Sequence, residues 1–231
     1  MHQCFSIFIF FFCIIFAKSI KEPFLDHKVD KHYKITRIDV PVHIDGFENE
    51  IFWDKILTLD DFVQDEPINM ELPTEKTEVK LDHDDEAIYV FAKLFDSDSE
   101  KISKRLSYKD DWLGAFDEVA DWFQIDFDSR HDHQTAFAFL VNASGVKLDA
   151  MVFDDMDYDL DWNAVWEAEV IVNNDGWNVE MKIPFSMLRY SSLENMNWGL
   201  NIFRYIDRKK EYISWVPFSR GINGVASKYG H

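Results

Sequence analysis

The stretch that decides the fold runs from Val165 to Tyr190 and reads VWEAEVIVNNDGWNVEMKIPFSMLRY. After the turn sequence Asn-Asn-Asp-Gly at 173–176, apolar side chains alternate with polar ones as far as Ile183. This period of two is typical of a strand with one buried face. Residues 167–172 form a strand-like run before the turn, and Asp-Gly accommodates the positive φ angles of a tight hairpin. Because Pro184 has no backbone donor and ends the ladder, the stretch predicts an antiparallel hairpin.

The same alternation recurs along most of the chain. It predicts further strands over residues 77–81, 87–95, 122–128, 135–141, 146–153, 198–205 and 211–216. Arg37–Ile44 also alternates and predicts an edge strand because it contains Pro41. Glu48–Ile56 has the spacing of a short helix, with Trp53 in the core. About ten short strands with few helical periods predict an all-β fold: a two-sheet antiparallel β-sandwich of the immunoglobulin-like kind, with one or two short helices.

The charge balance restricts the possible partners. The 231 residues include 43 acidic and 24 basic ones, giving a formal charge of −19. Such a surface repels phosphate backbones, so we expect no nucleic acid partner and favour neutral ligands or cations. The sequence contains no phosphate-binding loop, nucleophile elbow or His-Glu-x-x-His motif. It therefore predicts neither an enzyme nor an organic cofactor.

The N-terminal segment has the pattern of a secretory signal. Phe5–Ala17 is an apolar run of 13 residues followed by Lys18-Ser19, which suits a signal peptide over residues 1–19 better than a membrane span. An uncleaved anchor is the alternative. Both cysteines, Cys4 and Cys13, lie in this segment, so the exported chain would contain no thiol. Residues 20–36 are charged and aperiodic and are interpreted as a linker.

Several short motifs stand in a characteristic order along the rest of the chain. They include Ile44-Asp45-Gly46 with Trp53, Asp126-Phe127-Asp128, Gly176-Trp177, Ile183-Pro184-Phe185, Leu188-Arg189-Tyr190 and Trp198-Gly199. Together they resemble the carbohydrate-binding module family 9-like domain, and more closely the N-terminal domain of bacterial outer-membrane proteins that carry this module ahead of a β-barrel. The expected sandwich domain covers residues 37–218, with 219–231 as its C-terminal tail.

The resemblance implies a non-catalytic, exported domain that binds neutral sugars by stacking two aromatic rings around one residue, often with structural calcium. In the sugar-binding relatives the two rings occupy positions that correspond to Glu118–Ala120 and Ser219–Gly224, and neither segment contains an aromatic residue here. Two alternatives therefore stay open. One is a structural or interaction domain that precedes an outer-membrane barrel and has a degenerate sugar site. The other is a domain associated with O-glycosyl hydrolase activity.

Candidate site residues follow from the chemistry of sugars and of calcium. Sugar binding needs flat apolar faces together with carboxylates or amides for the hydroxyls. Trp112 and Trp162 lie in polar loops, and the matching polar groups nearby are Asp121, Gln124 and Arg130. Calcium prefers six to eight oxygen ligands, and the acidic loop supplies Asp155, Asp157 and Asp159 at alternate positions. A solvated charge cluster is the alternative for this loop, and His131-Asp132-His133 is interpreted as a turn.

Overall fold

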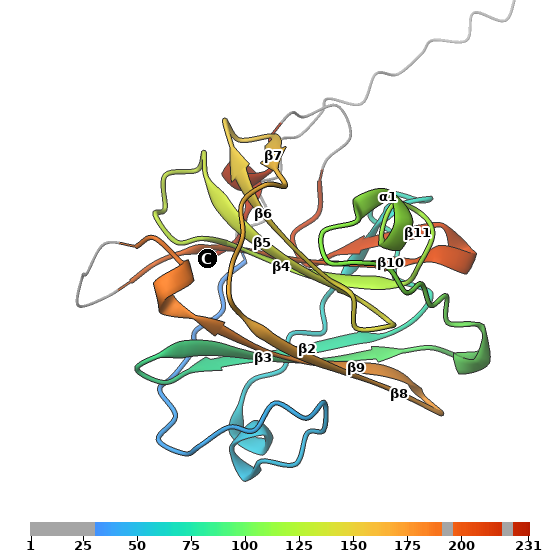
Figure 1. Cartoon of the computed structure of the whole chain (residues 1–231), viewed down its shortest axis with the longest axis horizontal. Helices are drawn as coiled ribbons and strands as arrows, with labels where there is room; N and C mark the ends of the chain where they lie inside the picture. Colours follow the sequence, from blue (N-terminus) through green and yellow to red (C-terminus); the bar gives the residue numbers. More distant parts are fainter. Residues whose placement is uncertain (1–30, 191–195, 219–223) are drawn as a thin grey trace, which may run out of the picture.

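The computed structural model describes residues 31–190, 196–218 and 224–231, and they form a two-layer β-sandwich (Figure 1). A seven-stranded sheet has the order β1-β11-β10-β4-β5-β6-β7, and a four-stranded sheet has the order β2-β3-β9-β8. Every pair of neighbouring strands is antiparallel. The predicted all-β antiparallel sandwich is confirmed. The predicted signal peptide lies outside the described residues.

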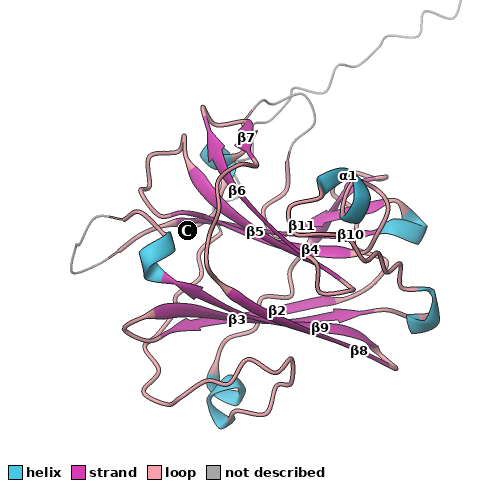
Figure 2. Cartoon of the chain, viewed as in Figure 1, coloured by secondary structure: helices cyan, strands magenta, loops and turns pink. Residues whose placement is uncertain are grey.

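The strands are separated by turns and by a few short helices (Figure 2). Their bounds are β1 Val63–Glu66, β2 Thr77–His83, β3 Ala87–Phe95, β4 Trp122–Asp128, β5 Ala136–Asn142, β6 Lys147–Phe153, β7 Asp157–Asp159, β8 Glu167–Asn173, β9 Gly176–Pro184, β10 Gly199–Ile206 and β11 Glu211–Ser214. The helices are α1 Trp112–Ala115 and the 3-10 helices η1 Ile51–Lys55, η2 Ser99–Lys101, η3 Phe185–Met187, η4 Asp207–Lys209 and η5 Ala226–Lys228. None of these described helices has the length and apolar character needed to cross a bilayer.

The hairpin of β8 and β9 forms as the opening stretch predicts. The two strands pair from Glu167 with Lys182 to Asn173 with Gly176. Gly176 has a φ of +141°, and a Cβ at this position would lie 2.1 Å from the carbonyl oxygen of Leu94. Only glycine lets the turn approach β3 this closely, so the residue fixes the hairpin against its neighbour.

The core fills the space between the two sheets. From β4 it receives Phe123, Ile125 and Phe127, which alternate with residues that face the other way. The buried guanidinium of Arg204 on β10 joins the layers: its Nη1 donates to Lys76 O at 2.9 Å and its Nη2 to Phe95 O at 2.6 Å. Burial lowers the pKa of Arg204 to about 10, so it stays charged at neutral pH.

The predicted strand over Arg37–Ile44 is wrong. The segment makes only an isolated bridge, between Arg37 and His83, and Val40 is 49% exposed. Pro41 interrupts the row of backbone donors, which explains why the alternation does not become a ladder. The following segment forms the five-residue helix η1, and the prediction of Trp53 as a core residue is confirmed because its exposure is 0%.

Candidate functional site

The outer face of the seven-stranded sheet carries aromatic and polar side chains where a solvated sheet would carry mainly charged ones. On β4, Trp122, Gln124 and Asp126 point away from the sandwich core. The strand register aligns Gln124 with Phe203 of β10 and with Leu140 of β5. These side chains form a continuous floor across the middle of the sheet.

Segments from both sides rise above this floor and turn it into a pocket of about 720 Å³. Figure 1 shows α1 and β7 on the same side of the seven-stranded sheet, opposite the four-stranded sheet. Trp112 comes from α1 and Tyr158 from β7. Tyr212 of β11 and Phe218, from the C-terminal part of the sequence, also line the pocket. The volume lies in the range of small-molecule binding sites, about 300–1,000 Å³.

The aromatic rings support one another. The ring of Trp122 stacks on Tyr205 at 5.7 Å between centroids and meets Tyr212 edge-on at 5.9 Å. Phe203 stacks on Phe218 at 5.6 Å. Trp112 is parallel to Phe116 at 6.3 Å, which orients the half-buried indole at the pocket. The pocket is therefore lined by flat apolar surfaces whose orientation is fixed before any ligand arrives.

A buried polar network lies beneath the rings. Gln124 Nε2 donates to both oxygens of Asp126, at 2.8 and 3.0 Å, and the hydroxyl of Tyr229 donates to Asp126 Oδ2 at 2.6 Å. Burial raises the pKa of Asp126 to about 7. The indole N–H of Trp122, a residue that lines the pocket, is buried and has no acceptor among the described residues.

Carboxylates stand at the rim. Asp65, Glu66 and Glu118 line the pocket together with the rings. Asp65 accepts a hydrogen bond from Phe218 N at 3.1 Å, and burial raises its pKa to about 6. Carboxylate oxygens accept hydrogen bonds from hydroxyls, and negative charge beside the pocket disfavours anions.

The structure brings two of the five predicted sugar-binding residues into this pocket, Trp112 and Gln124. Asp121 does not line the pocket: its side chain is fully buried, and its Oδ1 accepts hydrogen bonds from Asp207 N at 3.0 Å and from Ser103 N at 3.4 Å. Trp162 packs on the core rings Phe137 and Phe139, at 5.0 and 6.0 Å. Arg130 is exposed in the turn between β4 and β5.

The three aspartates proposed for calcium are not gathered around one point. The carboxylate of Asp155 accepts hydrogen bonds from Ser227 N at 2.7 Å, Ser227 Oγ at 2.8 Å and Val225 N at 3.1 Å. Asp157 and Asp159 lie on β7. Across residues 31–190, 196–218 and 224–231, no three histidine, cysteine or carboxylate side chains are grouped to hold a metal ion. Calcium binding at these aspartates stays a prediction.

Sequence reasoning did not single out Trp122, Phe203, Tyr158, Tyr212 or Phe218. A signal was present in β4, where the residues alternating with the core phenylalanines include a tryptophan and a glutamine. An aromatic residue on the polar side of a strand indicates a second covered face. The partners of Trp122 come from strands distant in sequence, so spacing alone could not assemble them.

Comparison with known proteins agrees with this architecture. Residues 44–218 match the family model described as carbohydrate family 9 binding domain-like, and the chain belongs to that family. No curated protein sequence matches the chain.

Several solved structures have a similar fold. A carbohydrate binding module family 9 from Caldicellulosiruptor kristjanssonii in complex with glucose is 17% identical, with a TM-score of 0.61 over 86% of this chain and 93% of that one. The same description with cellotriose gives 17% identity and a TM-score of 0.60 over 86% and 91%. A putative carbohydrate-binding protein from Bacteroides uniformis is 12% identical, with a TM-score of 0.59 over 78% and 87%.

Proposed function

We propose that this chain is a non-catalytic carbohydrate-binding domain and that a neutral saccharide binds in the aromatic pocket above the outer face of the seven-stranded sheet. The observation that carries the proposal is the pocket itself, in a chain whose family consists of carbohydrate-binding-like domains. A sugar ring has apolar C–H faces and a rim of hydroxyls. The faces fit against Trp112, Trp122 and Tyr212, and the hydroxyls reach the rim carboxylates.

The charge of the pocket supports a neutral ligand over an acidic one. Asp65, Glu66 and Glu118 line it, and the whole chain carries a formal charge of −19. A uronic acid or a sulfated sugar would meet like charges at the rim. The similar module bound to glucose and to cellotriose makes these two sugars the first ligands to test.

Isothermal titration of the folded chain with glucose, cellotriose and a panel of neutral oligosaccharides tests the proposal. Trp112→Ala removes one stacking surface and is expected to weaken binding by about tenfold. Leu113→Ala is the matched control, because Leu113 is the next residue of α1, is 73% exposed and does not line the pocket. Equal affinity of the two variants, or no heat from any sugar in the panel, would refute the proposal.

Catalysis is tested on the same samples. Chromogenic glycosides are expected to stay intact, because binding by stacked rings needs no proton transfer. Turnover that is lost in Asp65→Asn or Glu118→Gln would show instead that the rim carboxylates act as a hydrolytic pair.

We also propose that the chain is exported, on the evidence of the sequence of Phe5–Ala17. Expression of the full coding sequence in a bacterial host should give a product outside the cytoplasm that begins near residue 20. Mass spectrometry of that product measures the cleavage position, and an intact N-terminus on a cytoplasmic product would contradict export.

A further inference from the structure

A second pocket opens at one end of the sandwich, between the two sheets, with a volume of about 540 Å³. Its inner wall consists of side chains from both layers and from the segments that close this end: Leu81, Ile88, Phe127, Phe185, Trp198 and Leu200. Four of them, Leu81, Ile88, Phe127 and Leu200, belong to the hydrophobic core. The pocket therefore connects the solvent to the apolar core between the sheets.

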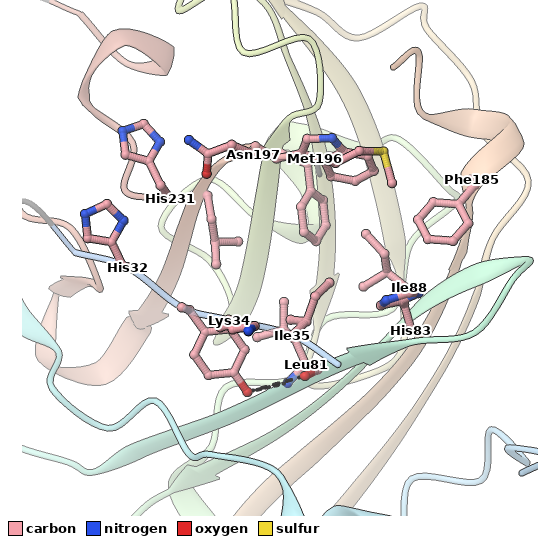
Figure 3. Close-up of a pocket in the computed structure, with 14 residues that line it drawn as sticks. His32, Lys34, Ile35, Leu81, His83, Ile88, Phe185, Met196, Asn197 and His231 are labelled. Carbon is pink, nitrogen blue, oxygen red and sulfur yellow. Dashed lines mark hydrogen bonds between the residues drawn. The ribbon is translucent and has the colours of Figure 1, made fainter. Parts of the chain in front are cut away.

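The rim of this pocket differs in charge from most of the molecule, because the described residues that line it include a lysine and no acidic side chain. The chain contains 43 acidic residues, yet none of the described residues that line the pocket is an aspartate or a glutamate. The polar residues that do line it include Lys34, His32, His83, Asn197 and His231. Figure 3 shows His32 and His231 side by side at one end of the pocket and Phe185 and Ile88 at the other.

One of the polar groups, the ammonium of Lys34, suits an anion. Lys34 is exposed and forms no ion pair with the described residues. His83 Nδ1 lies 2.8 Å from the carbonyl oxygen of Asp84, which can only accept, so its N–H is already used within the protein and Lys34 is the cation that this pocket offers to a ligand. The imidazoles of His32 and His231 are 5.6 Å apart, and His131 lies 4.9 Å from His231. This end of the sandwich thus concentrates the imidazoles of an otherwise acidic protein.

We propose that this pocket is a second binding site, for a small organic carboxylate with an apolar body, of the kind represented by a medium-chain fatty acid. The apolar body enters between the sheets against Leu81, Phe127 and Leu200, where it displaces water from apolar walls. The carboxylate stays at the mouth beside Lys34 and the imidazoles. Neutral sugars do not fit this division into an apolar interior and a cationic rim, so the site is distinct from the aromatic pocket.

Binding of decanoate to the full chain, measured by titration calorimetry, tests the proposal. Decan-1-ol is the uncharged ligand of the same length, and acetate is the same head group without the apolar body. We expect decanoate to bind at least fivefold more tightly than decan-1-ol, and acetate to give no binding. Equal affinity for decanoate and decan-1-ol would overturn the role of the cationic rim.

Variants locate the site. Lys34→Gln is expected to weaken decanoate binding by about fivefold, as for a partly solvated ion pair, and Lys34→Glu should weaken it further. Lys55→Gln is the matched control, because Lys55 is an exposed lysine of η1 that does not line the pocket. Ile35→Trp replaces an aliphatic side chain that lines the pocket by a bulkier indole ring and should abolish decanoate binding. Circular dichroism verifies that the variant is folded. Loss of decanoate binding in Trp112→Ala, with unchanged binding in Lys34→Gln, would place the ligand in the aromatic pocket and overturn the proposal.

Discussion

The buried carboxyl of Asp126 makes a specific prediction about stability and pH. Its exposure is 0%, and burial raises its pKa from 3.8 to about 7. The folded state therefore keeps this proton up to about pH 7, whereas the unfolded chain loses it near pH 3.8. Between these values the folded state binds more protons, so the free energy of unfolding falls as the pH rises. Each pH unit between the two pKa values lowers the free energy of unfolding by about 1.4 kcal/mol. From pH 5 to pH 8 the loss continues only as far as about pH 7, so it amounts to about 3 kcal/mol.

Other carboxyls determine where the stability maximum lies. Burial also raises the pKa of Glu180 to about 7 and that of Asp121 to about 6, which adds to the loss above pH 5. The ion pairs and hydrogen bonds of Glu48 and Glu75 outweigh their desolvation and lower their pKa values, so their contribution is lost in acid, as the pH falls through those lowered values. We expect the greatest stability at about pH 5.

The variant Asp126→Asn isolates the contribution of this one group. The side-chain oxygen of an amide at position 126 can still accept a hydrogen bond from the Tyr229 hydroxyl. Its NH2 group can donate to Gln124 Oε1 once the Gln124 amide flips. The decrease in unfolding free energy from pH 5 to pH 8 should therefore be smaller in the variant than in the unchanged chain, by about 3 kcal/mol. Urea unfolding followed by tryptophan fluorescence at unit pH steps measures it, with the exposed Asp60→Asn as control. The reasoning fails if Asp126→Asn keeps the pH dependence of the unchanged chain.

Two further substitutions test the fold. Gly176→Ala should lower the unfolding free energy by about 3 kcal/mol or more, because the added Cβ would lie 2.1 Å from Leu94 O. Gly145→Ala, where a Cβ would meet no atom within 4 Å, should lower it by about 1 kcal/mol. Similar urea midpoints for the two variants would contradict the turn geometry. Arg204→Met removes the buried guanidinium that joins the sheets and should lower the unfolding free energy by about 3 kcal/mol. The control Arg130→Met changes an exposed residue and should lower it by less than about 0.5 kcal/mol. Comparable losses in the two variants would show that the inter-sheet hydrogen bonds add little to stability.

The sheet strands were readable from the sequence because each has one face in the core. Alternation predicted β2, β3, β4, β5, β6, β8, β9, β10 and β11, and Gly176 marked the turn between β8 and β9. Two strands were missed, β1 and β7, which read VQDE and DYD. Neither has enough apolar residues to show a period, and each is held only at an edge of the larger sheet. Arg37–Ile44 shows the opposite error, because its alternating pattern makes one bridge to His83 of β2 and no longer ladder.

The candidate site was only partly readable, because its residues meet through non-sequential strand pairing. β4 lies beside β10, which is more than 70 residues further along the chain, and no local pattern predicts that neighbour. Asp121 shows a related difficulty. The two backbone groups that donate to it, Ser103 N and Asp207 N, are 18 and 86 residues away in sequence. The sequence around Asp121 therefore could not show that its carboxylate accepts hydrogen bonds from distant backbone groups.

The alternation along β4 has a consequence for how such a domain can diverge. Successive side chains serve different tasks, since Phe123 and Ile125 fill the interior while Trp122 and Gln124 form the floor of the pocket. A gene copy can therefore acquire a new ligand preference through substitutions on one side of the strand and leave the other side untouched. The same scaffold can then persist in lineages whose sequences have become nearly unrelated.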